Sequence, residues 1–387
     1  MWVHPACAYR EGFVKTPALF ARDYACRVTL TLVTAGESHG PALVAIVTGL
    51  PAGLVLSRDA IDADLSRRQQ GYGRSPRQQL EEDRVAVLAG LRHGRTLGTP
   101  LALVVINRDH ENWKWGMNPW PPEGEAEGKG KEAVTLPRPG HADLAGVMKF
   151  GLEDARDALE RASARHTAVV VAAGTVAKAL LAEIAIHVEG RVLTEGLERR
   201  VDEARAERDT VGGVVEVVAR GVPPGLGSFA TKEERLDARL AATVMGTQAV
   251  KGVEIGEGFT LAGLRGSEAH DEIFRDDRGY YRETNRAGGI EAGVSNGEDI
   301  VVRAAMKPLS TLMRPLRSAD LVTGEPGEAL VERSDVAAVE ALAVVAEACV
   351  AFELARAARE KFGGDSVGDF VAAHRAYVER IPWSART

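Results

Sequence analysis

The sequence of 387 residues predicts an α+β fold, in which a single domain combines antiparallel sheets with helices. Segments with strand and helix patterns are interleaved, but the strand segments mostly resemble hairpins rather than regular strand–helix–strand units. Because a doubly wound parallel sheet is built from such units, antiparallel sheets are favoured. The sequence has neither an internal repeat nor an obvious linker, so we predict one catalytic domain over residues 27–387. Residues 1–26 are predicted to be a poorly ordered N-terminal extension.

The first half of the predicted domain begins with two strands, at residues 27–33 and 43–47. Ser57 then precedes a helical pattern at residues 60–65, which is typical of an N-capped helix. This helix leads into a polar loop that contains glycine, at residues 67–74. Residues 113–132 are rich in proline, glycine and charge, which predicts a surface loop.

The second half is predicted to contain helices at residues 144–159, 168–186 and 232–245 and strands at residues 214–218 and 300–306. A turn at residues 223–227 and a long glycine-rich loop at residues 279–297 separate some of these elements. A final helix over residues 336–361 ends at Gly363, as helices often do.

The composition is that of a soluble globular protein, with 45% hydrophobic and 27% charged residues. The formal net charge of −7 argues against a nucleic-acid partner, because proteins that bind nucleic acids are usually more basic. No run of about 18 uncharged apolar residues occurs, so we predict no membrane span. A secretory signal is not expected, and Cys7, Cys26 and Cys349 form no close-spaced metal or redox pair. These features indicate a cytoplasmic protein.

Two histidines lie in short strings of small or charged residues, Gly36-Glu37-Ser38-His39-Gly40 and Arg138-Pro139-Gly140-His141-Ala142-Asp143. A glycine beside a histidine removes bulk, so the backbone and the ring can both approach a ligand. An imidazole titrates near neutral pH and can exchange a proton during a reaction. One such histidine is more often structural, but two such strings in one chain indicate catalysis.

Arginines accompany both strings. Arg68, Arg74 and Arg77 lie within ten residues, and Arg138 precedes His141 by three. A guanidinium group matches carboxylate and phosphate oxygens and keeps its charge, so these residues predict a site for a small anion. For residues 67–77 alone, a solvated basic loop is the alternative.

Two later segments indicate a site for a phosphate-bearing cofactor. Residues 285–297 are rich in glycine, which lets backbone amides face a ligand. Residues 307–311 follow one strand and add an ammonium group and two hydroxyls. A flexible loop followed by a helix cap is the alternative. Neither a Walker loop nor a strand-linked Gly-x-Gly-x-x-Gly string is present, which disfavours the common nucleotide-binding folds.

These strings together resemble those of the chorismate synthases, from about Arg27 to near the C-terminus. The matched motifs occur in the family's order: Gly36–Gly40, Arg67–Arg77, Arg138–Asp143, Ala162–Thr167, Gly246–Glu254, Asn285–Gly297, Lys307–Leu312 and Arg333–Val336. The resemblance implies a β-α-β sandwich with antiparallel sheets around central helices, and a homotetramer. It implies the anti-1,4-elimination of phosphate from 5-enolpyruvylshikimate 3-phosphate to give chorismate in the shikimate pathway. The reaction would require reduced FMN without net redox change.

The resemblance also implies roles for individual residues. His39 would protonate the departing phosphate, His141 would act on the reduced flavin, and Asp335 would relay the proton collected at flavin N5. Ser38 and Ser163 would support these groups. The residues implied to hold the substrate's anionic groups are Arg68, Arg74, Arg77 and Arg138. The implied flavin contacts are Arg68, Arg74, Ser163, Ala164, Arg165, Gln248, Ala249, Ala292, Lys307, Pro308, Leu309, Ser310, Thr311 and Arg333.

Several positions depart from the family pattern. Gln70 stands where glycine is usual, Pro76 is stiffer than expected, and His166 replaces the usual glutamate beside the flavin contacts. Ala337 and Glu340 replace the more usual cysteine and proline. The histidines expected to be structural or exposed are His4, His93, His110, His187, His270 and His374.

Two other functions remain compatible with the sequence. The chain could be a flavin-dependent reductase that uses Arg68 and Arg74 to hold NADPH. It could instead be a nucleic-acid-binding module built on residues 67–77, whose affinity would fall steeply with salt.

Overall fold

The computed structural model describes residues 29–75, 82–121, 127–331 and 335–383. The predicted extension, residues 1–26, lies outside these described residues. Arg77 and Arg333, which the resemblance places at the site, lie outside them as well.

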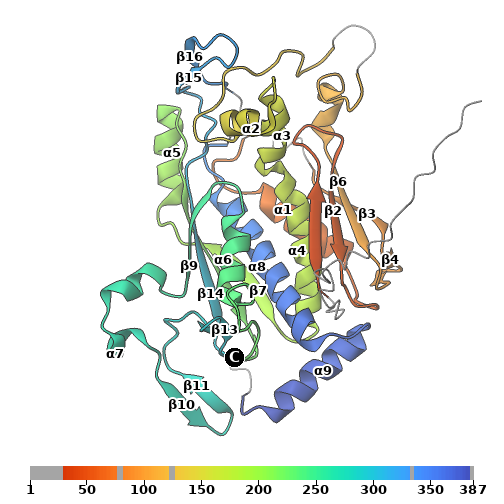
Figure 1. The fold of residues 1–387 in the computed structure, drawn as a ribbon, viewed down its shortest axis with the longest axis vertical. Helices are drawn as coiled ribbons and strands as arrows, with labels where there is room; N and C mark the ends of the chain where they lie inside the picture. Colours follow the sequence, from red (N-terminus) through yellow and green to blue (C-terminus); the bar gives the residue numbers. More distant parts are fainter. Residues whose placement is uncertain (1–28, 76–81, 122–126, 332–334, 384–387) are drawn as a thin grey trace, which may run out of the picture.

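Two four-stranded antiparallel sheets form the outer layers of the fold (Figure 1). The first sheet has the order β1-β2-β6-β3 and consists of β1 (Thr31–Ala35), β2 (Ala42–Thr48), β3 (Val85–Ala89) and β6 (Leu101–Ile106). The second has the order β7-β8-β14-β9 and consists of β7 (His187–Val192), β8 (Gly213–Arg220), β9 (Val250–Ile255) and β14 (Ile300–Met306).

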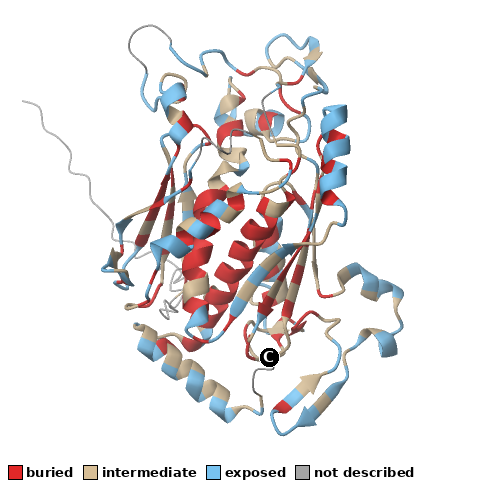
Figure 2. Ribbon diagram, turned by 180° about the vertical axis from the view of Figure 1, so that it is seen from behind, coloured by how far each residue is buried: buried red, intermediate tan, exposed pale blue. Residues whose placement is uncertain are grey.

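Two long helices, α4 (Thr167–Ala182) and α8 (Val339–Phe362), lie between the sheets, and α1 (Arg58–Gln69) packs against both of them. Helix α4 contacts β2 and β6, whereas α8 contacts β7 and β8. Most residues of both helices are buried, as Figure 2 shows. The predicted α+β class, with antiparallel sheets around central helices, is therefore confirmed.

The helical stretch Arg156–Ala182 is long and apolar enough to cross a membrane by length and composition. However, 67% of its most apolar window is buried inside the protein, as in the core helix of a soluble protein. It includes α3 (Arg156–Ala162), the 3-10 turn η3 (Ala164–His166) and α4.

Several predicted elements agree closely with the structure. Strand β14 has the predicted bounds, and the Ser57 hydroxyl caps α1 by accepting a hydrogen bond from the Ala60 amide at 3.2 Å. The first strand begins later than predicted, at Thr31, and α6 (Leu236–Met245) is shorter than the predicted helix at residues 232–245.

The single helix predicted at residues 144–159 is wrong. The segment forms α2 (Asp143–Phe150) and α3, because Gly151 ends α2 in the left-handed conformation with φ 65°. The predicted loop at residues 279–297 contains three short strands, β11 (Gly279–Arg282), β12 (Ile290–Glu291) and β13 (Val294–Ser295). Sequence analysis missed α9 (Val367–Arg380), although Ser366 and Asp369 form a capping box at its start.

The remaining elements are short and lie mostly at the edges of the fold. They are β4 (Leu91–Arg92), β5 (Arg95–Thr96), β10 (Ile273–Asp276), β15 (Arg317–Ala319), β16 (Pro326–Glu328), α5 (Leu197–Glu207), α7 (Gly266–Ala269), η2 (Arg108–Trp113) and η4 (Gly258–Gly263).

The contact between α4 and α8 depends on Gly174. A Cβ atom added there would lie 2.5 Å from the Cα atom of Ala348, so the helices approach too closely for a side chain at this position. The N-terminal turns of these two helices also border the cavity described below, so their spacing sets the spacing of its walls.

We predict that Gly174→Ala lowers the free energy of unfolding by about 1–2 kcal/mol. Overpacking costs about 1–3 kcal/mol, and a clash with backbone belongs in the upper half of this range, so about 1–2 kcal/mol remains after the helix-propensity gain of about 1 kcal/mol. Chemical denaturation of purified protein measures the difference. Gly368→Ala on α9 is the matched control, because its new Cβ would meet only Ser366 Oγ, at 3.6 Å. The control should be neutral or stabilising; a Gly174→Ala protein that is equally stable would contradict the prediction.

Candidate active site

A cavity of about 520 Å³ opens where the first turns of α4 and α8 meet the loops that precede them. This volume is typical of a site for a small ligand or cofactor. The predicted site residues that line it come from loops far apart in sequence: Ser38, His39, Arg68, Arg74, Arg138, His141, Ser163, Ala164, Arg165, Gln248, Ala249, Lys307, Leu309, Ser310, Thr311 and Asp335. The structure thus brings both histidine strings, four of the predicted site arginines and the Lys307 segment into one cavity.

Ala292 does not line this cavity. It lies in the turn between β12 and β13 with φ 51°, and the carbonyl of its neighbour Gly293 accepts a hydrogen bond from the amide of Leu236 at the start of α6. The cavity residues Thr247–Ala249 follow the other end of α6. A helix of 10 residues is about 15 Å long, so this turn lies about one helix length from the cavity. Pro308 is also not a lining residue, although its neighbours on both sides are.

Arg68 is buried at the cavity wall and is held by several partners. Its Nε donates to Thr167 Oγ1 at 2.9 Å, and its Nη1 donates to Asp83 Oδ2 at 3.2 Å. Asp83 is also paired with Arg165, whose Nη1 lies 2.7 Å from Oδ1. Burial, together with the charges of Arg165 and Arg74, lowers the pKa of Arg68 to about 10. The guanidinium therefore keeps its charge at neutral pH.

Arg74 and Asp335 form an ion pair at the cavity, with Nη1 2.7 Å from Oδ2. The amide of Ser75 donates to Asp335 Oδ1 at 2.7 Å, and the amide of Val336 donates to the carbonyl of Gly73 at 2.8 Å. The loop after α1 and the segment before α8 are thus joined through the two side chains. The Arg74 Nε is buried and has no hydrogen-bond partner among the described residues, so it is a donor that a ligand could use.

The second histidine string folds around Asp143, whose side chain is fully buried. Arg138 Nε donates to Asp143 Oδ2 at 2.9 Å, Arg138 Nη1 donates to Thr311 Oγ1 at 3.0 Å, and His141 Nδ1 contacts Asp143 Oδ1. Burial favours the neutral acid, but the hydrogen bonds from His141 and Arg138 outweigh it and hold the pKa of Asp143 well below its usual range. Asp143 therefore stays ionised and fixes both side chains against the cavity.

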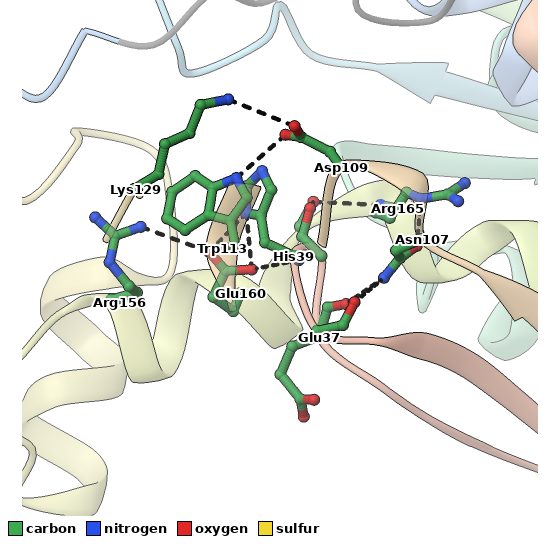
Figure 3. Close-up of polar contacts among 12 residues, drawn as sticks. Glu37, His39, Asn107, Asp109, Trp113, Lys129, Arg156, Glu160 and Arg165 are labelled. Carbon is green, nitrogen blue, oxygen red and sulfur yellow. Dashed lines mark hydrogen bonds and ion pairs between the residues drawn. The ribbon is translucent and has the colours of Figure 1, made fainter. Parts of the chain in front are cut away.

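His39 lies in the loop between β1 and β2 and is 4% exposed. Its Nδ1 lies 2.8 Å from Glu160 Oε1, and its ring stacks on Trp113 with centroids 4.1 Å apart (Figure 3). Next to it, the Ser163 hydroxyl donates to Ser38 Oγ at 3.3 Å. His110, which was expected to be structural or exposed, contacts the carbonyl oxygen of His39 through Nδ1 at 2.9 Å.

Sequence analysis missed the acidic residues that hold the site cations, Asp83 and Glu160, and the aromatic partner Trp113. Glu160 stands two residues before the Ala162–Thr167 motif, so that motif was the available signal. Trp113 was placed in a surface loop, but it ends η2 and is 7% exposed. Asp83 stands in a part of the sequence that carried no pattern of its own.

Gln248 offers an unsatisfied polar atom at the cavity. Its Oε1 is buried and has no hydrogen-bond partner among the described residues, while its Nε2 lies 3.2 Å from His166 Nδ1. Burial lowers the pKa of His166, so this histidine is neutral at pH 7. A buried acceptor of this kind is expected to meet a donor from a bound ligand.

Comparison with known proteins agrees with these features. The sequence model described as chorismate synthase matches residues 30–196 and 191–358. A chorismate synthase of Desulforudis audaxviator is 52% identical over 386 residues, which cover 91% of this chain and 98% of the relative. One of Geobacter sulfurreducens is 50% identical over 393 residues, covering 91% and 99%. A crystal structure of chorismate synthase is similar with a TM-score of 0.73 and 34% identity, covering 92% of this chain and 98% of that one. The chain belongs to the chorismate synthase family.

Proposed function

We propose that the chain catalyses the anti-1,4-elimination of phosphate from 5-enolpyruvylshikimate 3-phosphate to give chorismate, with reduced FMN in the same cavity. The observation that carries this proposal is the shared cavity, in which His39, His141 and the buried arginines face one volume of about 520 Å³. A site built for an anion that leaves with a proton needs this combination of fixed cations and titratable groups.

Substrate anions would be held by Arg68, Arg74 and Arg138. Each charged hydrogen bond is worth roughly 1.5–3 kcal/mol net, so three guanidinium groups can bind a small anion firmly. Arg68 and Arg138 are already fixed by Asp83 and Asp143, so they need little reorganisation when a ligand arrives. Arg77 is assigned the same role and lies outside the described residues.

Phosphate leaves slowly from an allylic carbon unless its developing charge is stabilised. We assign the proton donor for this step to His39, supported by Ser38, and the group that acts on the cofactor to His141, supported by Asp143. Asp335 would relay the proton that leaves the ring, on the cofactor side of the cavity. Ligand binding at Arg74 would loosen the Arg74–Asp335 ion pair and make this carboxylate available.

The flavin would be held by Ser163, Ala164, Arg165, Gln248, Ala249 and the segment Lys307–Thr311. The unpartnered Oε1 of Gln248 fits this assignment, because it can accept a hydrogen bond from a ring N–H group. Lys307 Nζ donates to the carbonyl of Gly140 at 2.6 Å, which joins the flavin segment to the His141 string. When bound, the reduced flavin would supply electron density to the reacting ring.

We propose further that the chain acts in the cytoplasm as a homotetramer, with NADPH as the reductant if it reduces its own flavin. Large apolar side chains on the first sheet support an assembly: Val33 is 65%, Leu88 73% and Ile106 58% exposed.

The test of the proposed activity is an anaerobic assay for chorismate from 5-enolpyruvylshikimate 3-phosphate. With chemically reduced FMN we expect turnover, and with oxidised FMN alone we expect none. Turnover with oxidised FMN and NADPH would show that the protein also reduces its own flavin. A failure to form chorismate with reduced FMN, by protein that binds it, would refute the proposal.

We predict that His39→Ala and His141→Ala each lower kcat by about 10²–10⁴ while folding stays intact, since each removes a proton-transfer group. The measurement is anaerobic turnover, with circular dichroism to check the fold. His187→Ala, on the exposed start of β7, is the matched control and should keep full turnover. Wild-type turnover by the His39→Ala protein would exclude this residue as the acid.

We predict that Asp335→Asn keeps flavin affinity but slows the chemical step, because the amide preserves the shape of the carboxylate and loses its basicity. Single-turnover kinetics measure the step, and flavin fluorescence measures affinity. The rate should fall by about 10²-fold or more. A near-normal single-turnover rate would count against a proton role for this residue.

A further inference from the structure

We infer that Glu160 is the positioning residue of His39, fixing its ring through Nδ1 so that Nε2 delivers the proton to the leaving group. This inference rests on the proposed function, since it takes His39 as the proton donor. Glu160 is not among the residues that line the cavity, whereas His39 is. Glu160 would therefore act through His39 and not on the ligand.

The Glu160 carboxylate is 2% exposed and engages His39 twice. Its Oε2 accepts a hydrogen bond from the His39 backbone amide at 2.8 Å, and its Oε1 and Oε2 lie 2.8 and 3.0 Å from His39 Nδ1. The Glu160 carbonyl also accepts a hydrogen bond from the Ser38 amide at 3.1 Å. Backbone and ring of His39 are thus both docked onto one residue of α3.

These contacts fix the protonation pattern of the ring. An ionised carboxylate can only accept hydrogen bonds, so Nδ1 must carry a proton to make its contact with Glu160. Proton exchange with a ligand then falls to Nε2, the ring's other nitrogen. A buried carboxylate at Nδ1 also stabilises the imidazolium form, as required of a general acid.

The 3-10 turn η2 fixes the plane of the ring. Trp113 stacks on His39 with an interplanar angle of 22°, and its Nε1 donates to Asp109 Oδ2 at 3.1 Å. The Arg156 guanidinium lies 4.9 Å from the Trp113 ring centroid, and its Nη1 lies 3.6 Å from Glu160 Oε1. Figure 3 shows His39, Trp113, Arg156 and Glu160 gathered together, while the Glu37 carboxylate points away from them.

Other charges near the ring must be considered for its titration. Those on the elements packed around it are Glu37, Asp109, His110, Lys129, Arg156, Glu160 and Arg161, and those that line the same cavity are Arg68, Arg74, Arg138, His141, Arg165, Lys307 and Asp335. Most of these groups are cationic and oppose protonation of His39. The Glu160 carboxylate carries the opposite charge and is in direct contact with Nδ1.

The test separates the charge of Glu160 from its geometry. Glu160→Gln keeps the shape but removes the charge, whereas Glu160→Asp keeps the charge on a shorter side chain. Activity that needs protonated His39 falls as pH rises through its titration. In Glu160→Gln we therefore expect the basic limb of the kcat–pH profile to move about one unit lower or more. In Glu160→Asp we expect kcat to fall at least tenfold with the limb near its wild-type position. KM should stay within about twofold in both.

A second readout does not depend on turnover. The NMR titration of His39, assigned by its loss in His39→Ala, should move to lower pH in Glu160→Gln by the same amount as the kinetic limb. Glu37→Gln is the matched control, because its exposed carboxylate points away from the His39 ring: kcat should stay unchanged, and the limb and titration should move far less than in Glu160→Gln.

The outcomes distinguish the two proposals. If His39→Ala retains wild-type turnover, the proposed role of His39 fails, whatever Glu160 does. If His39→Ala is inactive but folded Glu160→Gln keeps the wild-type limb and titration, the inference about Glu160 alone is overturned. It is also overturned if both Glu160 variants lower kcat alike without moving the limb, which is the result of a merely structural role.

Discussion

The site depends on one constraint, which is that a charge buried at the cavity wall must have a partner. Removing a carboxylate or guanidinium from water costs several kcal/mol unless opposite charge and hydrogen bonds compensate it. Here Asp83 holds Arg68 and Arg165, Asp143 holds Arg138 and His141, and Glu160 holds His39. Each acid is buried behind the cation or imidazole that it supports. The cavity therefore presents positive and titratable groups while their counter-charges stay inside the protein.

This arrangement explains how a chain of net charge −7 can build an anion site. The chain as a whole is acidic, but the fold gathers its cationic side chains at one place. The loops that carry them meet at the first turns of α4 and α8. Asp335 differs from the other acids, since it lines the cavity with its partner Arg74. Asp83 and Asp143, by contrast, do not line the cavity and contact it only through the side chains that they hold.

Local patterns were enough to predict much of the fold. Some elements are determined by residues that are close together in the sequence. Examples are the alternation at residues 300–306, the Ser57 cap and the long apolar runs of α4 and α8. Errors arose where one residue's backbone conformation decides the outcome, as at Gly151, which divides an otherwise helical segment. The order of the strands in each sheet could not be read from such patterns, because β6 pairs with β2 and β3 although other elements separate it from both along the chain.

In the site, too, the sequence indicated some residues and not others. The ligand-facing residues could be predicted, whereas the residues that support them could not. Residues that would face the ligand stand in unusual strings, so His39, His141 and the Lys307 segment could be found without a structure. Their supports could not, because Asp83, Trp113 and Glu160 reach the site through contacts that span many residues of sequence and need only one atom in the right place. Ala292 is the reverse case. Its string resembles a ligand loop, but in one copy of the chain the length of α6 separates it from the cavity. A sequence motif therefore indicates which side chains could bind a ligand, but the packing of the fold decides which of them line the same cavity.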